Sequence, residues 1–168
     1  MNHTSQHDQY FKMLGISLVI CRNKYGKWLA VKETDNRGWW VPGGLVDPPE
    51  NFIEAGVRET KEEAGVDVEI KGLLRFEYNI KGNFQRLKTV LYAEPLDHDQ
   101  KPKSVADYES DEAKWVTLKE LVEMKTQEPG WRGPELYNWA KYIEDGGPIY
   151  PLSILDGEGA PVPMPKKN

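Results

Sequence analysis

The chain has 168 residues, a formal net charge of −5 at pH 7 and one cysteine, Cys21. This length suits one domain, which can bury roughly 70 % of the surface of its unfolded chain. The acidic balance argues against a nucleic-acid duplex as partner, but not against a nucleotide whose phosphates arrive with a cation. A lone cysteine excludes an internal disulfide and favours a cytoplasmic location. No apolar run is long enough to span a membrane, so we expect no membrane partner.

The first predicted elements are two strands. Residues 14–22 and 27–33 are rich in β-forming side chains and are joined by a turn that ends near Gly26. Cys21 belongs to the first run, where a packed thiol is a better interpretation than a nucleophile. We expect residues 1–12 to be a flexible segment, residues 13–147 to form one domain and residues 148–168 to be a proline-rich tail.

A glycine-rich loop and a helix follow. Pro42-Gly43-Gly44 predicts a tight loop whose backbone can approach a ligand closely, because glycine has no side chain in the way. Pro48 and Pro49 cannot lie inside a helix, so the helix should begin near residue 50 or 51 and end at a left-handed cap at Gly65. Its buried stripe should consist of apolar or small side chains at helical spacing: Ile53, Val57, Thr60 and Ala64.

Three glutamates on this helix indicate a metal site. Glu59, Glu62 and Glu63 stand at i, i+3 and i+4, which gathers their carboxylates within an arc of roughly 100°. Like charges so placed repel each other on a helix, but a divalent cation that binds carboxylate oxygens would reverse that interaction. The alternative is a solvated acidic face, which is the usual explanation for a run of acids.

The stretch from Gly44 to Val66 resembles the signature of the Nudix hydrolases. The family pattern is G-x5-E-x7-R-E-U-x-E-E-x-G-U, in which U is aliphatic, and the chain departs from it only at Thr60. Thr60 lies on the buried stripe, and we expect its hydroxyl to bond back to the carbonyl of Gly56. The resemblance implies an α/β fold, a sandwich of α/β/α layers with a mixed β-sheet and the signature helix packed on it.

The resemblance also implies roles for the matching residues. Glu59, Glu62 and Glu63 would be catalytic and would bind Mg2+ or Mn2+, with the Gly43 carbonyl as a further ligand. Gly44, Glu50, Arg58 and Gly65 would be structural, and Arg58 would pair with Glu50 to brace the loop against the helix. The signature from Gly44 to Val66 is called the box below. The attacking water would be activated by a glutamate of the box or by a later acid.

The elements after the helix are mostly strands. Residues 66–80 and 84–94 should form a hairpin that turns at 81–83, and residues 114–116 a short strand. Thr117 and Glu120 form a capping-box pattern for a helix to about Lys125, and Pro134 opens a last helix that Gly146-Gly147 ends.

Two further groups of residues are candidates for the site. An acidic loop at 107–112 supplies Glu109 and Glu112 as additional catalytic acids, with a solvated loop as the alternative. Side chains that could contact a substrate are Trp40, Tyr78, Phe84 and Arg86, although strand core is the commoner role for such aromatics. Trp39 matches a tryptophan that the family often has and should be structural.

These observations predict a Mg2+-dependent pyrophosphohydrolase that cleaves a nucleoside diphosphate linked to another moiety, by attack of water on phosphorus. Nucleoside triphosphates, including oxidised ones, are the favoured substrates. Nucleotide sugars, ADP-ribose and dinucleoside polyphosphates are alternatives, and a catalytically silent nucleotide-binding domain is the alternative of another class. The oligomeric state stays open, with a homodimer as one option. The apolar residues at 149–155 should pack on the body or on a neighbour.

Overall fold

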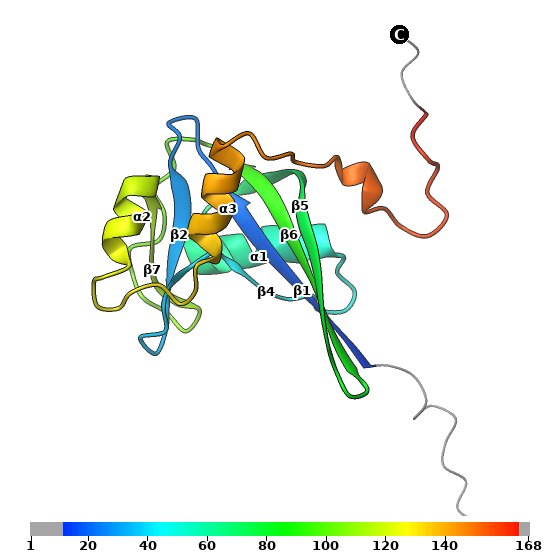
Figure 1. Cartoon of the computed structure of the whole chain (residues 1–168), viewed down its shortest axis with the longest axis horizontal. Coiled ribbons are helices and arrows are strands. Elements are labelled where there is room, and N and C mark those ends of the chain that lie inside the picture. Colours follow the sequence, from blue (N-terminus) through cyan, green and yellow to red (C-terminus); the bar gives the residue numbers. More distant parts are fainter. Residues whose placement is uncertain (1–11, 165–168) are drawn as a thin grey trace, which may run out of the picture.

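The computed structural model describes residues 12–164, which form two β-sheets between layers of helix (Figure 1). Helix α1 covers one side, and α2 and α3 lie on the other. The strands are β1 (Lys12–Cys21), β2 (Trp28–Glu33), β3 (Gly38–Trp40), β4 (Gly43–Leu45), β5 (Val68–Lys81), β6 (Phe84–Pro95) and β7 (Ser110–Val116). The helices are α1 (Phe52–Ala64), α2 (Leu118–Met124), α3 (Glu135–Glu144) and a short 3-10 helix, η2 (Leu152–Ile154).

The sheets combine parallel and antiparallel pairing. The four-stranded sheet has the order β4-β1-β6-β5, and β1 runs parallel to β6 from the pair Lys12–Phe84 to the pair Cys21–Ala93. The three-stranded sheet has the order β3-β2-β7 and is antiparallel. The predicted α/β/α sandwich with a mixed sheet is therefore confirmed.

Strand β1 explains why helices cover both sides. Ile16, Leu18 and Ile20 belong to the core under α2 and α3, whereas Val19 and Cys21 belong to the core under α1. Successive side chains of a strand point to opposite faces, so a strand buried on both faces reads as one continuous apolar run. Burial also raises the pKa of the Cys21 thiol well above its usual range, which makes this cysteine a packing residue rather than a nucleophile.

Helix α1 has clear signals at both ends. The Asn51 side chain accepts hydrogen bonds from the amides of Ile53 and Glu54, and the Glu54 carboxylate accepts one from the Asn51 amide. Gly65 ends the helix at φ 68°, and its amide donates to the carbonyl of Lys61. The Thr60 hydroxyl donates to the Gly56 carbonyl at 2.7 Å, as predicted, so the polar departure from the family pattern is satisfied inside its own helix.

Several elements differ from the sequence prediction. Residues 43–45 form the short strand β4, where we expected a tight loop at 42–44, and residues 38–40 form the short strand β3. Residues 110–112 were expected in an acidic loop but belong to β7, which starts at Ser110. β4 pairs with β1 and β7 pairs with β2, both distant in sequence, and no local side-chain pattern reports that pairing. β3 pairs with the preceding strand, β2, as a hairpin.

The proline-rich tail packs on the body over its first part. The Tyr150 amide and carbonyl both bond to Leu73 on β5 at 2.8 Å, and Leu152 and Leu155 contact the core under α1. The expected flexible segment 1–12 lies outside the described residues except for Lys12, which is the first residue of β1. Among residues 12–164, no helix is both long enough and apolar enough to cross a bilayer.

Candidate active site

The two glycines of β4 lie directly against the glutamates of α1. The Gly43 amide donates a hydrogen bond of 2.8 Å to Oε2 of Glu63, and Gly43 adopts φ 150°. A Cβ atom on Gly44 would overlap the carboxylate of Glu59. A side chain at position 44 would therefore have to displace the Glu59 carboxylate, which Arg58 holds, or move the loop away from it.

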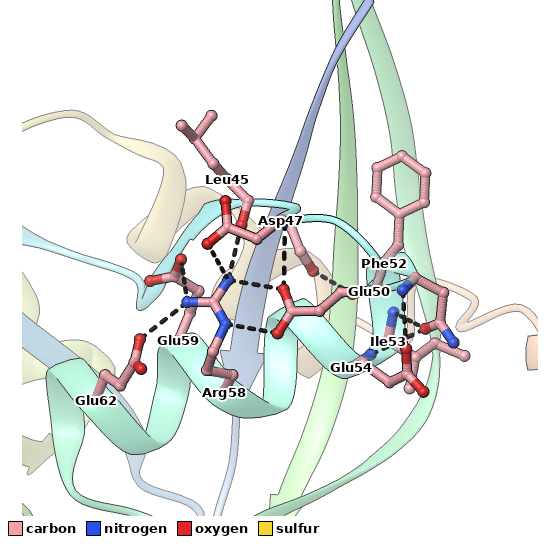
Figure 2. Close-up of polar contacts among 11 residues, drawn as sticks. Leu45, Asp47, Glu50, Phe52, Ile53, Glu54, Arg58, Glu59 and Glu62 are labelled. Carbon is pink, nitrogen blue, oxygen red and sulfur yellow. Dashed lines mark hydrogen bonds and ion pairs between the residues drawn. The ribbon is translucent and has the colours of Figure 1, made fainter.

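Arg58 links this loop to the helix (Figure 2). Its guanidinium donates to both oxygens of Glu50 at 2.6 and 2.9 Å and to the Leu45 carbonyl at 2.9 Å. Its Nη1 also donates to Glu59 and Glu62, each at 2.9 Å. The predicted pairing of Arg58 with Glu50 is thus seen in the structure, and one cation holds the loop and two of the box carboxylates together.

The electrostatics of the box are dominated by the burial of the Glu59 and Glu63 carboxyl groups, which favours their protonated forms. Burial raises the pKa of Glu63 to about 8, and the nearby charges of Glu59, Glu33 and Glu109 add to the shift. Burial also raises the pKa of Glu59, against the opposing effect of Arg58. The hydrogen bonds from Arg58 lower the pKa of Glu50, which stays charged as the partner of the arginine. The site therefore holds more negative charge than Arg58 alone compensates.

Of the two later acids, the structure brings Glu109 to the box. The loop that carries Glu109 is tied to the C-terminal end of α1, since the hydroxyl of Ser110 donates to the Glu63 carbonyl at 2.6 Å. Lys103 adds bonds to the Glu62 carbonyl and to Asp107. The negative charge of Glu109 contributes to the raised pKa of both Glu59 and Glu63.

Glu112 points elsewhere. It lies within β7 opposite Lys32 of β2, next to Ala113, which packs in the core under α1. Because neighbouring strand residues alternate, the Glu112 side chain is directed to the other face of the sheet. The structure does not bring Glu112 to the box.

Glu33 is near the site but was not among the predicted residues. It is 4 % exposed at the end of β2, forms an ion pair with Arg132 and has Arg37 at 3.3 Å. Among the described residues, one of its oxygens, Oε2, has no hydrogen-bond partner. The sequence does hold a signal for Glu33. Leu29 and Val31 of β2 are core residues, and the next side chain on the same face of the strand is the charged Glu33.

The predicted substrate residues do not form a single pocket. Trp40 is 9 % exposed, donates its indole N–H to Glu135 at 3.0 Å and has the Arg132 guanidinium 4.1 Å above its ring. A base could stack on Trp40 only if Arg132 moved away. The other tryptophan, Trp39, is also buried.

The remaining predicted residues lie on the β5–β6 hairpin and face two ways. Tyr78 pairs with Leu87, whereas Arg86 pairs with Asn79, so Tyr78 and Arg86 project from opposite faces. Phe84 is two residues from Arg86 on β6 and shares its face. Arg86 borders a small cavity of about 120 Å³ together with Glu77, Tyr78, Asn79 and Lys88.

The box residues fit a hard divalent cation by their chemistry. Within residues 12–164, no three acidic, histidine or cysteine side chains already converge as a metal shell, because Arg58 holds oxygens of Glu59 and Glu62. The donors are nevertheless carboxyl groups, and a divalent cation would stabilise the charged forms of Glu59 and Glu63, whose pKa values are raised by burial. Glu59, Glu62 and Glu63 are therefore suited to hold Mg2+ or Mn2+, with Glu109 and the Gly43 carbonyl nearby.

A family model described as the NUDIX domain matches residues 12–139. This chain belongs to the Nudix family. The putative 8-oxo-dGTP diphosphatase YtkD of Bacillus subtilis is 38 % identical to it over 90 residues, which is 54 % of this chain and 53 % of that protein. The asymmetrical bis(5'-nucleosyl)-tetraphosphatase of Mus musculus is 34 % identical over 92 residues, which is 51 % of this chain and 60 % of that protein. The Nudix chain thus matches only about half of these relatives' length.

Solved structures agree on the Nudix fold. A NUDIX hydrolase from Nitrosomonas europaea superposes with a TM-score of 0.69 at 21 % identity, covering 89 % of this chain and 100 % of that one. The Bacillus subtilis pyrophosphohydrolase BsRppH gives a TM-score of 0.60 at 27 % identity, over 80 % of this chain and 83 % of the other.

Proposed function

We propose that this Nudix protein is a metal-dependent hydrolase that cleaves a phosphoric anhydride bond in a nucleoside diphosphate linked to another group. The observation that carries the proposal is the cluster of Glu59, Glu62 and Glu63 under the backbone of Gly43 and Gly44. Glu59 is buried, and burial raises the pKa of both Glu59 and Glu63. Such a cluster is costly to the fold unless it binds something positive, so the arrangement favours a functional site.

Each residue near the box has a distinct task in this proposal. Glu59, Glu62 and Glu63 would hold Mg2+ or Mn2+, which when bound neutralises phosphate charge and lowers the pKa of water. Arg58 and Glu50 fix the loop so that the backbone at Gly43 meets the carboxylates. Glu109 reaches the box from another element, and either Glu109 or a box glutamate would accept the proton of the attacking water.

The favoured substrates are nucleoside triphosphates, including oxidised ones. Support comes from a relative named as a putative 8-oxo-dGTP diphosphatase. Relatives named as 8-oxo-dGDP phosphatases support an oxidised nucleotide but a diphosphate one. Dinucleoside polyphosphates are the second candidate, supported by the tetraphosphatase relatives. Nucleotide sugars and ADP-ribose complete the set that a first assay should include.

The test is hydrolysis by the purified protein with Mg2+ over a panel of these four substrate classes, with the products separated by anion-exchange chromatography. Each class gives its own products: pyrophosphate or phosphate from a triphosphate, a nucleoside monophosphate and a sugar phosphate from a nucleotide sugar or ADP-ribose, and two nucleotides from a dinucleoside polyphosphate. We expect the wild type to turn over one class. Glu62→Gln should lower that turnover at least about 100-fold, because a neutral amide replaces one of the charged carboxylates that would hold the metal. Glu123→Gln is the matched control, since Glu123 is exposed on α2 and, within residues 12–164, forms an ion pair only with Lys119, at 3.9 Å.

Two results would count against the proposal. Equal turnover by Glu62→Gln and the wild type would remove the box from the reaction. Silence of the wild type over the whole panel, with Mg2+ binding demonstrated by calorimetry, would favour the nucleotide-binding domain without turnover.

A further inference from the structure

The β5–β6 hairpin has an open edge. Strand β5 is the last strand of its sheet, and the hairpin projects beyond the rest of the body (Figure 1). Tyr150 covers this edge at Leu73 through two backbone hydrogen bonds. Over the described part of the chain, no other segment pairs with the outer edge of β5 between residues 74 and 81. An uncovered edge of this kind is a template for another strand.

The open part of β5 also exposes a row of apolar side chains. Phe76, Tyr78 and Ile80 are 47 %, 71 % and 53 % exposed and share one face, opposite Thr89, Leu87 and Gln85 of β6. The alternate positions, on the other face, are polar: Glu77, Asn79 and Lys81. An apolar stripe beside unpaired backbone groups is a surface that monomers usually avoid.

We propose that two copies of this chain associate by antiparallel pairing of residues 77–81 of β5. The partner is a second copy because the segment is complementary to itself. A two-fold axis perpendicular to the sheet keeps each residue on the same face in both copies. Residues that face each other must therefore be an even number of positions apart in sequence, or identical.

Charge and the tail disfavour the two allowed registers that would overlap more of the strands. Pairing centred on Tyr78 would set Arg75 against the partner's Lys81, which places like charges opposite each other twice. Pairing centred on Glu77 would carry the partner's Gly82 to Gly72, where Ile149 and Tyr150 already lie. Pairing centred on Asn79 avoids both problems.

The register centred on Asn79 gives favourable pairs on both faces. Glu77 then faces the partner's Lys81, and the symmetric contact repeats that ion pair. Tyr78 faces the partner's Ile80, so the two apolar stripes become continuous. Lys81 forms no ion pair within the described chain, and Glu77 has only Arg75, at 2.7 Å, as a partner.

The resulting dimer joins two four-stranded sheets into one sheet of eight strands. Only the hairpin ends overlap, so the two bodies stay apart and the box at the other elements is untouched. The contact is small, and we therefore expect a reversible dimer whose population depends on concentration.

The test is sedimentation equilibrium of the full chain over a wide concentration range at low salt. Lys81→Glu and Glu77→Lys should each raise the dimer dissociation constant about tenfold or more, because each replaces two attractive pairs with two repulsive ones. The double variant with both substitutions should return the constant to near the wild-type value. Lys101→Glu makes the same charge change on an exposed loop and should leave the constant unaltered.

A second variant tests the apolar face. Ile80→Ser should also weaken the dimer, and circular dichroism should show each variant folded, since Ile80 and Lys81 are exposed. A wild type that remains monomeric at its highest soluble concentration would overturn the proposal. A double variant as weak as either single variant would overturn it as well, because the two charges would then not face each other.

Discussion

Glu63 carries the largest conflict between burial and charge in the box. It accepts a bond from the Gly43 amide, which favours its charged form, yet burial and three neighbouring carboxylates raise its pKa to about 8. In the metal-free folded protein the Glu63 carboxyl group therefore stays protonated up to about pH 8, whereas in the unfolded chain it loses its proton near the ordinary pKa of 4.5. A cation that requires the carboxylate must displace the proton.

This conflict predicts an unusual dependence of stability on pH. Between these two pKa values the folded state binds more protons than the unfolded state, so the free energy of unfolding falls as pH rises. Relative to Glu63→Gln, which cannot ionise, the metal-free wild type should lose ~1–3 kcal/mol between pH 6 and pH 9. Urea unfolding of both proteins at a series of pH values measures the difference.

Magnesium should reverse that trend. With Mg2+ present, the wild type should gain stability over the variant as pH rises, because the charged carboxylate is the form that binds metal. A constant difference between the two proteins at every pH, with or without Mg2+, would show that Glu63 ionises normally in the fold.

Single residues differ in how well the sequence revealed them. The hydroxyl of Thr60 and the cap at Gly65 follow from local helix rules, and both are found as predicted. Glu33 was missed because its importance arises from Arg132, which is 99 positions away in sequence. Trp40 was misjudged for the same reason, because the side chain that covers its ring is Arg132, in the segment before α3.

At the scale of elements, the unit that makes the box is the strand β4, the following loop and helix α1. Arg58 joins all three through Glu50, the Leu45 carbonyl and Glu59, and opposite charges raise its pKa well above the usual range. Without this cation, Glu59 would keep its buried charge and lose its partner. Loss of one member of a partly buried pair is costly for that reason.

Arg58→Ala should therefore lower the free energy of unfolding of the metal-free protein by ~2–3 kcal/mol. Arg58→Lys should recover only part of that loss, since an ammonium group cannot make the two-pronged contact with Glu50. The midpoints of urea unfolding for the two variants give the comparison. An unchanged midpoint in Arg58→Ala would contradict the bracing role of Arg58.

The elements themselves were predictable to different degrees. Helix α1 and the long strands carry periodic patterns and caps, and the sequence located them to within a few residues. Strands β3 and β4 are three residues each and depend on pairing with β2 and β1. The start of β7 at Ser110 depends on β2 in the same way, which is why Glu112 was misplaced in a loop.

At the scale of the whole molecule, the tail covers one point on the edge of the sheet that carries both β4 and the proposed dimer edge. Tyr150 pairs with Leu73 where β5 has its register shifts, and the backbone of the tail lies so close that only glycine fits at position 72. Composition predicted that this tail would be neither helix nor central strand. It could not predict which edge the tail covers, because one isolated pair of backbone bonds leaves no pattern in the side chains.

Substitution of Tyr150 separates the backbone contact from the side chain. Tyr150→Pro removes the amide that donates to the Leu73 carbonyl, whereas Tyr150→Ala keeps that amide and removes the half-exposed ring. Hydrogen exchange at the Leu73 amide should accelerate about tenfold in Tyr150→Pro and change little in Tyr150→Ala, because opening this edge costs less once one of its two bonds is lost. Equal acceleration in both variants would mean that the ring, rather than the backbone, holds the tail. No acceleration in either variant would mean that Tyr150 does not protect the Leu73 amide. The tail would then no longer explain why dimer registers that reach Leu73 are disfavoured.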